Sequence, residues 1–139
     1  MSDLEELERA RQLYIAYARI VDQGDHEELL NLFTPDGFFE SSWLGRFEGH
    51  EGMRRNFEAN RSRGIRNFQM RHLFSNLDIK LNGDRGQANY YVSVYVTRDS
   101  VTQLLGIGAS HDELRKVGDR WCFHSRTVTF DTKKPDILS

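Results

Sequence analysis

Two residues fifty positions apart in this sequence, Asp22 and His72, have the side chains that acid–base chemistry needs. His72 stands in the middle of an apolar strand-like segment, and Asp22 stands near the end of a long amphipathic helical segment. Histidine titrates near neutral pH, so one imidazole can both take and give a proton. A carboxylate on one ring nitrogen fixes the tautomer and favours the imidazolium as it forms. If the fold brings both residues into an apolar pocket, they can abstract a proton without a metal or a cofactor.

The composition is that of one domain without a strongly charged binding surface. The 139 residues include 19 basic and 21 acidic side chains, and the formal net charge is −2. The arginines are scattered, which argues against a nucleic-acid partner, and no apolar run approaches the length of a membrane span. Cys122 is the only cysteine, and the acidic N-terminus lacks the apolar core of a secretion signal. We expect a cytoplasmic protein.

Apolar periodicity predicts three helices followed by four long strands. The first helix covers 3–23 and ends at Gly24, and Asp25 caps a short second helix that reaches Leu32. A turn is predicted at 34–37, short strands at 38–42 and 45–48, and a third helix at about 50–61. The long strands, rich in Val, Tyr, Phe and Thr, are predicted at 70–81, 86–98, 101–116 and 120–131.

Helices that precede a run of antiparallel strands are typical of the α+β class. We expect a single domain over residues 1–139, with a core at about 5–131 and a short C-terminal tail at 132–139. A strongly twisted sheet of this kind can curl around the long first helix and enclose a conical cavity.

A series of short motifs resembles the SnoaL-like branch of the NTF2-like superfamily, over roughly residues 5–131. The motifs are Tyr17-Ala18-Arg19 with Asp22, Leu32-Phe33-Thr34-Pro35-Asp36-Gly37, Gly49-His50-Glu51-Gly52-Met53, Arg71-His72-Leu73-Phe74-Ser75-Asn76, Asp112-Glu113-Leu114-Arg115, Gly118-Asp119-Arg120-Trp121-Cys122-Phe123 and Arg126. The resemblance implies an NTF2-like (cystatin-like) cone, in which three N-terminal helices pack in a strongly curved, mostly antiparallel sheet.

Two functional groups share this pattern. One contains cofactor-free lyases and isomerases, such as scytalone dehydratase, bile-acid dehydratase, hexachlorocyclohexane dehydrochlorinase and polyketide cyclases. It implies a catalytic Asp at Asp22, a catalytic His at His72 and an active-site Tyr at Tyr17, acting on a hydrophobic cyclic small molecule. The other group is the β subunit of aromatic-ring-hydroxylating dioxygenases, and it implies a non-catalytic chain that supports a Rieske-type α subunit. A third possibility is a binding module for a lipid or polyketide.

Three further residues are candidates for the site, and two of them have alternative roles. Tyr17 is five residues from Asp22 on the predicted helix, and is either a proton donor or part of the core. Arg126 can pair with Asp22, bind an anionic leaving group, or point its head into solvent, and the exposed position is favoured. Phe74 is a candidate for contact with the substrate.

The segment Tyr90–Tyr95 must point one set of side chains inward. Either Tyr90 or the pair Tyr91 and Tyr95 lines the cavity, and we prefer the pair as polar, substrate-binding lining. The outer face of such a Tyr- and Val-rich sheet is an apolar patch, so we expect a homotrimer or homodimer.

No resident metal or cofactor is predicted. No Cys/His cluster has Rieske spacing, and no Gly-rich phosphate loop follows a strand. Scytalone dehydratase has a second catalytic histidine on the strand near 108–112, but His111 is a few positions off when the sequences are aligned on Trp121. The sequence therefore lacks a clear equivalent of one catalytic residue of scytalone dehydratase.

Overall fold

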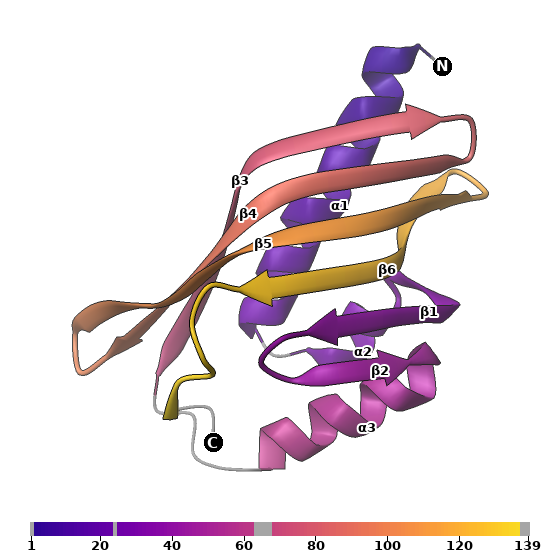
Figure 1. The fold of residues 1–139 in the computed structure, drawn as a ribbon. Helices are drawn as coiled ribbons and strands as arrows, with labels where there is room; N and C mark the ends of the chain where they lie inside the picture. The colour runs from indigo at the N-terminus through magenta and orange to yellow at the C-terminus, as the bar shows by residue number, and fades with distance from the viewer. Residues whose placement is uncertain (1, 24, 63–67, 137–139) are drawn as a thin grey trace.

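The structure, a computed structural model, describes residues 2–23, 25–62 and 68–136. The helices are α1 (Asp3–Gln23), α2 (His26–Leu30) and α3 (Gly49–Ser62). The strands are β1 (Phe33–Ser41), β2 (Gly45–Glu48), β3 (Gln69–Asn82), β4 (Arg85–Arg98), β5 (Val101–Val117) and β6 (Arg120–Phe130), as Figure 1 shows. The predicted α+β class is confirmed, and the four long strands begin and end within one or two residues of their predicted bounds.

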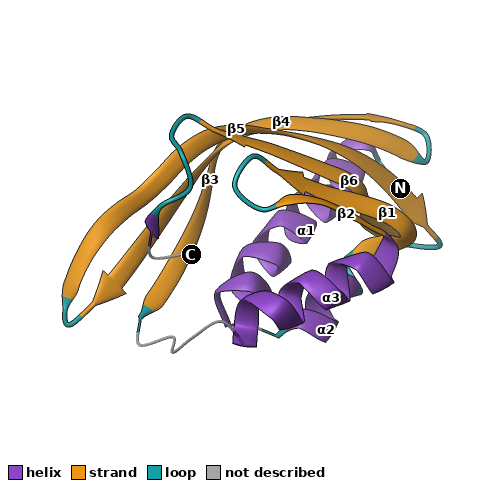
Figure 2. Cartoon of the chain, turned by 60° about the horizontal axis from the view of Figure 1, so that its bottom comes forward, coloured by secondary structure: helices purple, strands orange, loops and turns teal. Residues whose placement is uncertain are grey.

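The strands form one sheet in the order β2-β1-β6-β5-β4-β3. All neighbours are antiparallel except β1 and β6, which are parallel. The sheet curves over the helices, so that α1, α2 and α3 lie on its concave side (Figure 2). Strand β3 is an edge of the sheet, and α1 packs beside it. This is the predicted cone, with its first helix inside.

Local sequence signals explain where the helices begin. Ser2 accepts a hydrogen bond from the backbone N–H of Glu5 and donates one to its carboxylate, so the two residues cap the start of α1. Asp25 caps α2 as predicted, by accepting from the backbone N–H of Glu28 at 3.1 Å. Gly24, predicted to end the first helix, and the last three residues of the predicted tail lie outside the described residues.

The predicted turn at 34–37 is instead part of β1. Phe33 pairs with Phe123 of β6, and the pairing resumes only at Phe38 with Ser125. The Pro- and Gly-containing segment is therefore an irregularity inside the strand, in the part of β1 that precedes its pairing with β2, where a proline is tolerated.

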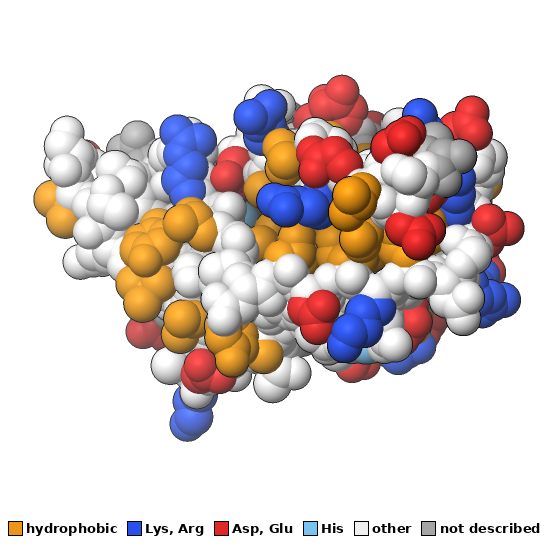
Figure 3. Space-filling model, turned by 90° about the horizontal axis from the view of Figure 1, so that it is seen from above, with side chains coloured by type: hydrophobic (Ala, Val, Ile, Leu, Met, Phe, Trp, Pro, Cys, Tyr) orange, Lys and Arg blue, Asp and Glu red, His pale blue; other side chains and the backbone are white. Residues whose placement is uncertain are grey.

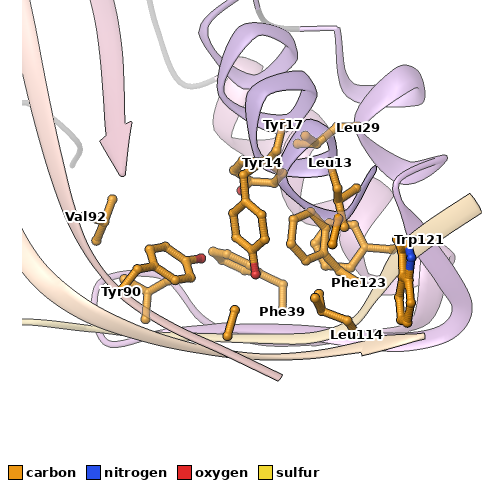
Figure 4. Packing of buried hydrophobic residues seen from close by; sticks show 14 of the residues in the cluster. Leu13, Tyr14, Tyr17, Leu29, Phe39, Tyr90, Val92, Leu114, Trp121 and Phe123 are labelled. Atoms are coloured by element: carbon orange, nitrogen blue, oxygen red, sulfur yellow. The ribbon is translucent and has the colours of Figure 1, made fainter. Parts of the chain in front are cut away.

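The core lies between α1 and the concave face of the sheet. It is unusually aromatic, with Tyr14, Tyr17, Phe33, Tyr90 and Phe123 all at most 6% exposed. Figure 4 shows that the side chains of Tyr14 and Tyr90 point toward one another from α1 and β4, with their hydroxyl oxygens in the middle of the packed cluster. A polar group must be present between them, because buried hydroxyls are nearly always hydrogen-bonded.

Bulges decide which residues face this core. In β3, the segment from Ser75 to Asp78 has one residue more than the segment of β4 with which it pairs. Asn76, within this segment, has a positive φ of 54°. In β6, the pairing with β5 skips one residue at His124. Each bulge exchanges the inward and outward positions for the rest of its strand.

Candidate active site

Helix α1 and strand β3 bring Asp22 and His72 together. The imidazole Nδ1 of His72 lies 2.7 Å from Oδ1 of Asp22. The backbone N–H of His72 also donates to both carboxylate oxygens, at 3.1 and 3.2 Å. The side chains are 19% and 10% exposed, so the pair is largely shielded from water but still accessible.

The other ring nitrogen, Nε2 of His72, has no hydrogen-bond partner among the described residues. With Nδ1–H donating to Asp22, Nε2 carries the free lone pair and can accept a proton. Asp22 then stabilises the imidazolium that results. The pair therefore has the arrangement that a general acid–base catalyst requires.

A second polar cluster lies in the centre of the core, around Asp112. Its carboxylate is fully buried, and Tyr14 and Tyr90 donate to Oδ2 at 2.8 and 2.7 Å. Ser110 donates to Oδ1 at 3.2 Å. Arg126, which is 2% exposed, donates to the Tyr90 hydroxyl, and its Nε lies 3.5 Å from Oδ2 of Asp112.

The electrostatics of this cluster are set by burial. Loss of water raises the pKa of Asp112 above its usual range, although Arg126 and the hydroxyl donors act in the opposite direction. Burial likewise raises the pKa values of Tyr14, Tyr17 and Tyr90, so these phenols stay protonated at neutral pH. They serve as hydrogen-bond donors, not as bases.

The favoured prediction that Arg126 is exposed was wrong, and so was its pairing with Asp22. The bulge at His124 turns Arg126 into the core, where it pairs with Asp112. Its guanidinium lies 4.0 Å from the centre of the Tyr17 ring, close enough for a cation–π contact.

The predicted position of Tyr91 and Tyr95 in the cavity lining was also wrong. Strand β4 points Tyr90 inward together with Val92 and Val94, all at most 3% exposed. Tyr91 is 52% exposed on the outer face, and Tyr95 shares that face. Neither tyrosine is placed to contact a ligand inside the cone.

Tyr17 and Phe74 lie between the two polar groups. Phe74 follows His72 on the same face of β3 and packs edge-on against Tyr14 and Tyr90, with ring centroids 6.0 and 5.2 Å apart. Tyr17 is buried, and its ring centroid lies 6.0 Å from that of Phe74. Among the described residues, no hydrogen bond joins Tyr17 to Asp22 or His72. The structure therefore places Tyr17 in the core, with its ring against the guanidinium of Arg126.

Sequence reasoning missed Asp112 and Tyr14. The alternation of side chains along β5 could have identified Asp112. Leu114 faces the core, and Asp112, two residues away, lies on the same face of the strand. His111 points outward instead, where it contacts Asn89 and Glu113. It cannot replace the second histidine of scytalone dehydratase.

A groove of about 500 Å³ runs between α1 and β3. Its lining includes Tyr14 and Phe74, and Phe74 lies two residues after His72 on the same face of β3. Figure 3 looks down on this side of the molecule and shows hydrophobic side chains at the bottom of a hollow, with charged side chains around it. Asp22 and His72 themselves are not part of the lining.

Two features are absent from the described part of the chain. In residues 2–23, 25–62 and 68–136, no three His, Cys, Asp or Glu side chains are grouped as a metal site would require. None of the helices found there is both long and apolar enough to cross a membrane.

The curved sheet wrapped around α1 is the NTF2-like, or cystatin-like, fold. A family model described as a SnoaL-like domain matches residues 2–127, and the chain belongs to this family. No curated protein matches the sequence.

Solved structures agree with this assignment. A protein of unknown function from Nostoc punctiforme, with a cystatin-like fold, is 25% identical, with a TM-score of 0.80 and 97% of each chain covered. A protein from Catenulispora acidiphila, in complex with S-DNPA, is 27% identical, with a TM-score of 0.83 over 93% of this chain and 96% of that one. A variant of Rv3472 from Mycobacterium tuberculosis, of unknown function, is 25% identical, with a TM-score of 0.81 over 93% and 78%.

Proposed function

We propose that this protein is a cofactor-independent lyase of the dehydratase type, or an isomerase, that acts on a hydrophobic cyclic small molecule. The observation that carries the proposal is the bond of 2.7 Å between Nδ1 of His72 and Asp22, with Nε2 unpartnered among the described residues. The structure of a relative in complex with S-DNPA supports a binding function for proteins of this shape.

In the proposed reaction, Nε2 of His72 removes a proton from a carbon next to an activating carbonyl group. Asp22 holds the imidazole in the required tautomer and stabilises its charged form. In a lyase, the imidazolium then protonates the departing hydroxyl, and a double bond and water are formed. In an isomerase, it returns the proton to another carbon. Tyr17, a protonated phenol on the same helix as Asp22, is the candidate for polarising the substrate carbonyl.

A solvent-exchange assay tests this proposal before the substrate is known. A panel of cyclic aryl ketones and β-hydroxy ketones is incubated with the protein in D₂O and excess EDTA, and deuterium uptake and loss of water are followed by mass spectrometry. We expect at least one member to exchange or eliminate faster with wild-type protein than with a His72→Gln variant. Equal rates for both proteins across the panel would contradict the acid–base role.

One observation favours a non-catalytic alternative. The Asp22 carboxylate accepts the backbone N–H of His72 as well as the ring, so the pair also ties α1 to β3. This is what a structural hydrogen bond would do in a binding module or in a β-like subunit next to a Rieske-type partner. Under that alternative, the Asp22→Asn substitution lowers stability and leaves the exchange rates of the panel unchanged.

The outer face of the sheet leads to a prediction about assembly. Leu73, Tyr91 and Ile107 lie on adjacent strands of this face and are 49%, 52% and 41% exposed. We propose that a second copy of the chain covers them in a homodimer or homotrimer.

Introducing two charges into this patch should separate the copies. Sedimentation at micromolar concentration is expected to show an oligomer for wild-type protein and a monomer for Tyr91→Glu with Ile107→Glu. We expect the dissociation constant to rise about 100-fold or more, because desolvated aromatic anchors dominate such interfaces. Val117→Glu is the control: Val117 is more exposed, at 58%, but lies at the end of β5, so this variant should remain an oligomer. A wild-type protein that is only monomeric would refute this assembly.

A further inference from the structure

We propose that the groove between α1 and β3 is a binding site for apolar carboxylates. The carboxylate is bound by Arg11 and Arg19 at the rim, and the apolar part of the molecule packs on Tyr14 and Phe74. A volume of about 500 Å³ is in the usual range for a small-molecule site.

The charge of the groove is the first argument. Its lining contains two arginines and no acidic side chain, on a protein whose net charge is −2. Neither Arg11 nor Arg19 forms an ion pair or a hydrogen bond with any described residue. Both guanidinium groups are therefore available to a ligand, and guanidinium matches the geometry of a carboxylate.

The arrangement of α1 is the second argument. Arg11, Ile15 and Arg19 are four residues apart, so they form one row along the helix and make the rim. The neighbouring row begins with Tyr14 and Ala18 and makes the floor. The methyl side chain of Ala18 leaves space between helix and strand that a larger residue would fill.

The same floor continues to the dyad. The row of Tyr14 and Ala18 reaches Asp22 after four more residues, and the inner face of β3 leads from Phe74 to His72 after two. The groove and the dyad are therefore consecutive along both elements, and a bound molecule that extends past Phe74 would reach the dyad. This last step rests on the proposed function, whereas the binding site does not.

Isothermal titration with 2-naphthoate and its uncharged counterpart 2-naphthamide tests the site. We expect the wild-type protein to bind the naphthoate about tenfold more tightly than the amide, and each of Arg11→Gln and Arg19→Gln to weaken naphthoate binding about fivefold. Affinity for the amide should not change in these two variants. Ala18→Leu, which fills the floor, should weaken both ligands.

The controls separate this site from a general charge effect and from the dyad. Arg71→Gln removes an exposed arginine from the opposite face of β3 and should bind like wild type. His72→Gln should also retain naphthoate binding, even if it abolishes turnover. Equal affinity of wild-type protein for the two probes, or an equal loss in Arg71→Gln, would overturn the carboxylate site without affecting the proposed role of His72.

Discussion

Replacing His72 by glutamine is expected to lower turnover by about 10²–10⁴-fold, the usual contribution of a positioned acid–base group. Glutamine keeps a similar size and can still bind Asp22 through its amide, but it cannot exchange a proton at neutral pH. The loss should fall on kcat, because the imidazole acts on the reacting proton and does not form the aromatic wall of the site.

The matched control for this prediction is His111→Gln, which makes the same substitution on the outer face of the sheet. It should leave turnover unchanged, because the ring of His111 is hydrogen-bonded to Asn89 and Glu113 at the surface. Circular dichroism and a thermal melt establish that the His72 variant is folded. Full turnover in folded His72→Gln protein would rule out the dyad as the catalytic group.

Replacing Asp112 by asparagine is expected to lower the free energy of unfolding by about 3–5 kcal/mol, because it leaves a buried guanidinium without its counter-charge. Arg126 cannot lose its proton, so its charge must stay in the core. The opposite variant, Arg126→Met, should cost less, about 1–3 kcal/mol, because the remaining carboxyl group can become neutral. Urea denaturation at pH 7 measures both values.

The pH dependence separates these two variants. Burial already raises the pKa of Asp112 in the presence of Arg126, and removing the arginine raises it further. A carboxyl group with a raised pKa contributes its full stability below the unfolded value of about 4 and loses it as pH rises through the folded value. Arg126→Met should therefore become more stable from pH 7 to pH 5, and Asp112→Asn should show no such gain from this site.

Glu113→Gln is the control for this pair of variants, since Glu113 neighbours Asp112 on β5 but points outward. Its contact with the His111 ring is exposed, so the substitution should cost less than about 1 kcal/mol. If Asp112→Asn cost no more than Arg126→Met at pH 7, the buried carboxylate would not be the necessary partner of the guanidinium.

The fold could be predicted from the sequence to a large extent because its elements have strong local signals. The alternation in 86–98 and 101–116 defines strands without any tertiary information, and Asp25 is a clear helix cap. The meeting of Asp22 and His72 was predicted from a family resemblance, because no local pattern relates residues fifty positions apart.

It was harder to predict which side chains lie on the inner face of the sheet and which on the outer face, for a specific physical reason. Arg126 would lie on the outer face if β6 were regular, and a single bulge at His124 turns it into the core. In β4, two aromatic residues in succession, Tyr90 and Tyr91, fit either face by composition. The hydroxyl of Tyr90 is buried because Asp112 and Arg126 satisfy its hydrogen bonds, and that partnership is visible only in three dimensions.

The carboxylate of Asp22 also protects an edge of the sheet from pairing with a strand of another molecule. Strand β3 is an edge of the sheet, and an edge amide that points outward can recruit a strand from another molecule. At His72 this amide is already occupied by Asp22, so α1 blocks the addition of a foreign strand near the start of the edge strand. An alanine at position 22 would thus remove a safeguard against aggregation together with the partner of the imidazole, whereas asparagine would preserve the safeguard.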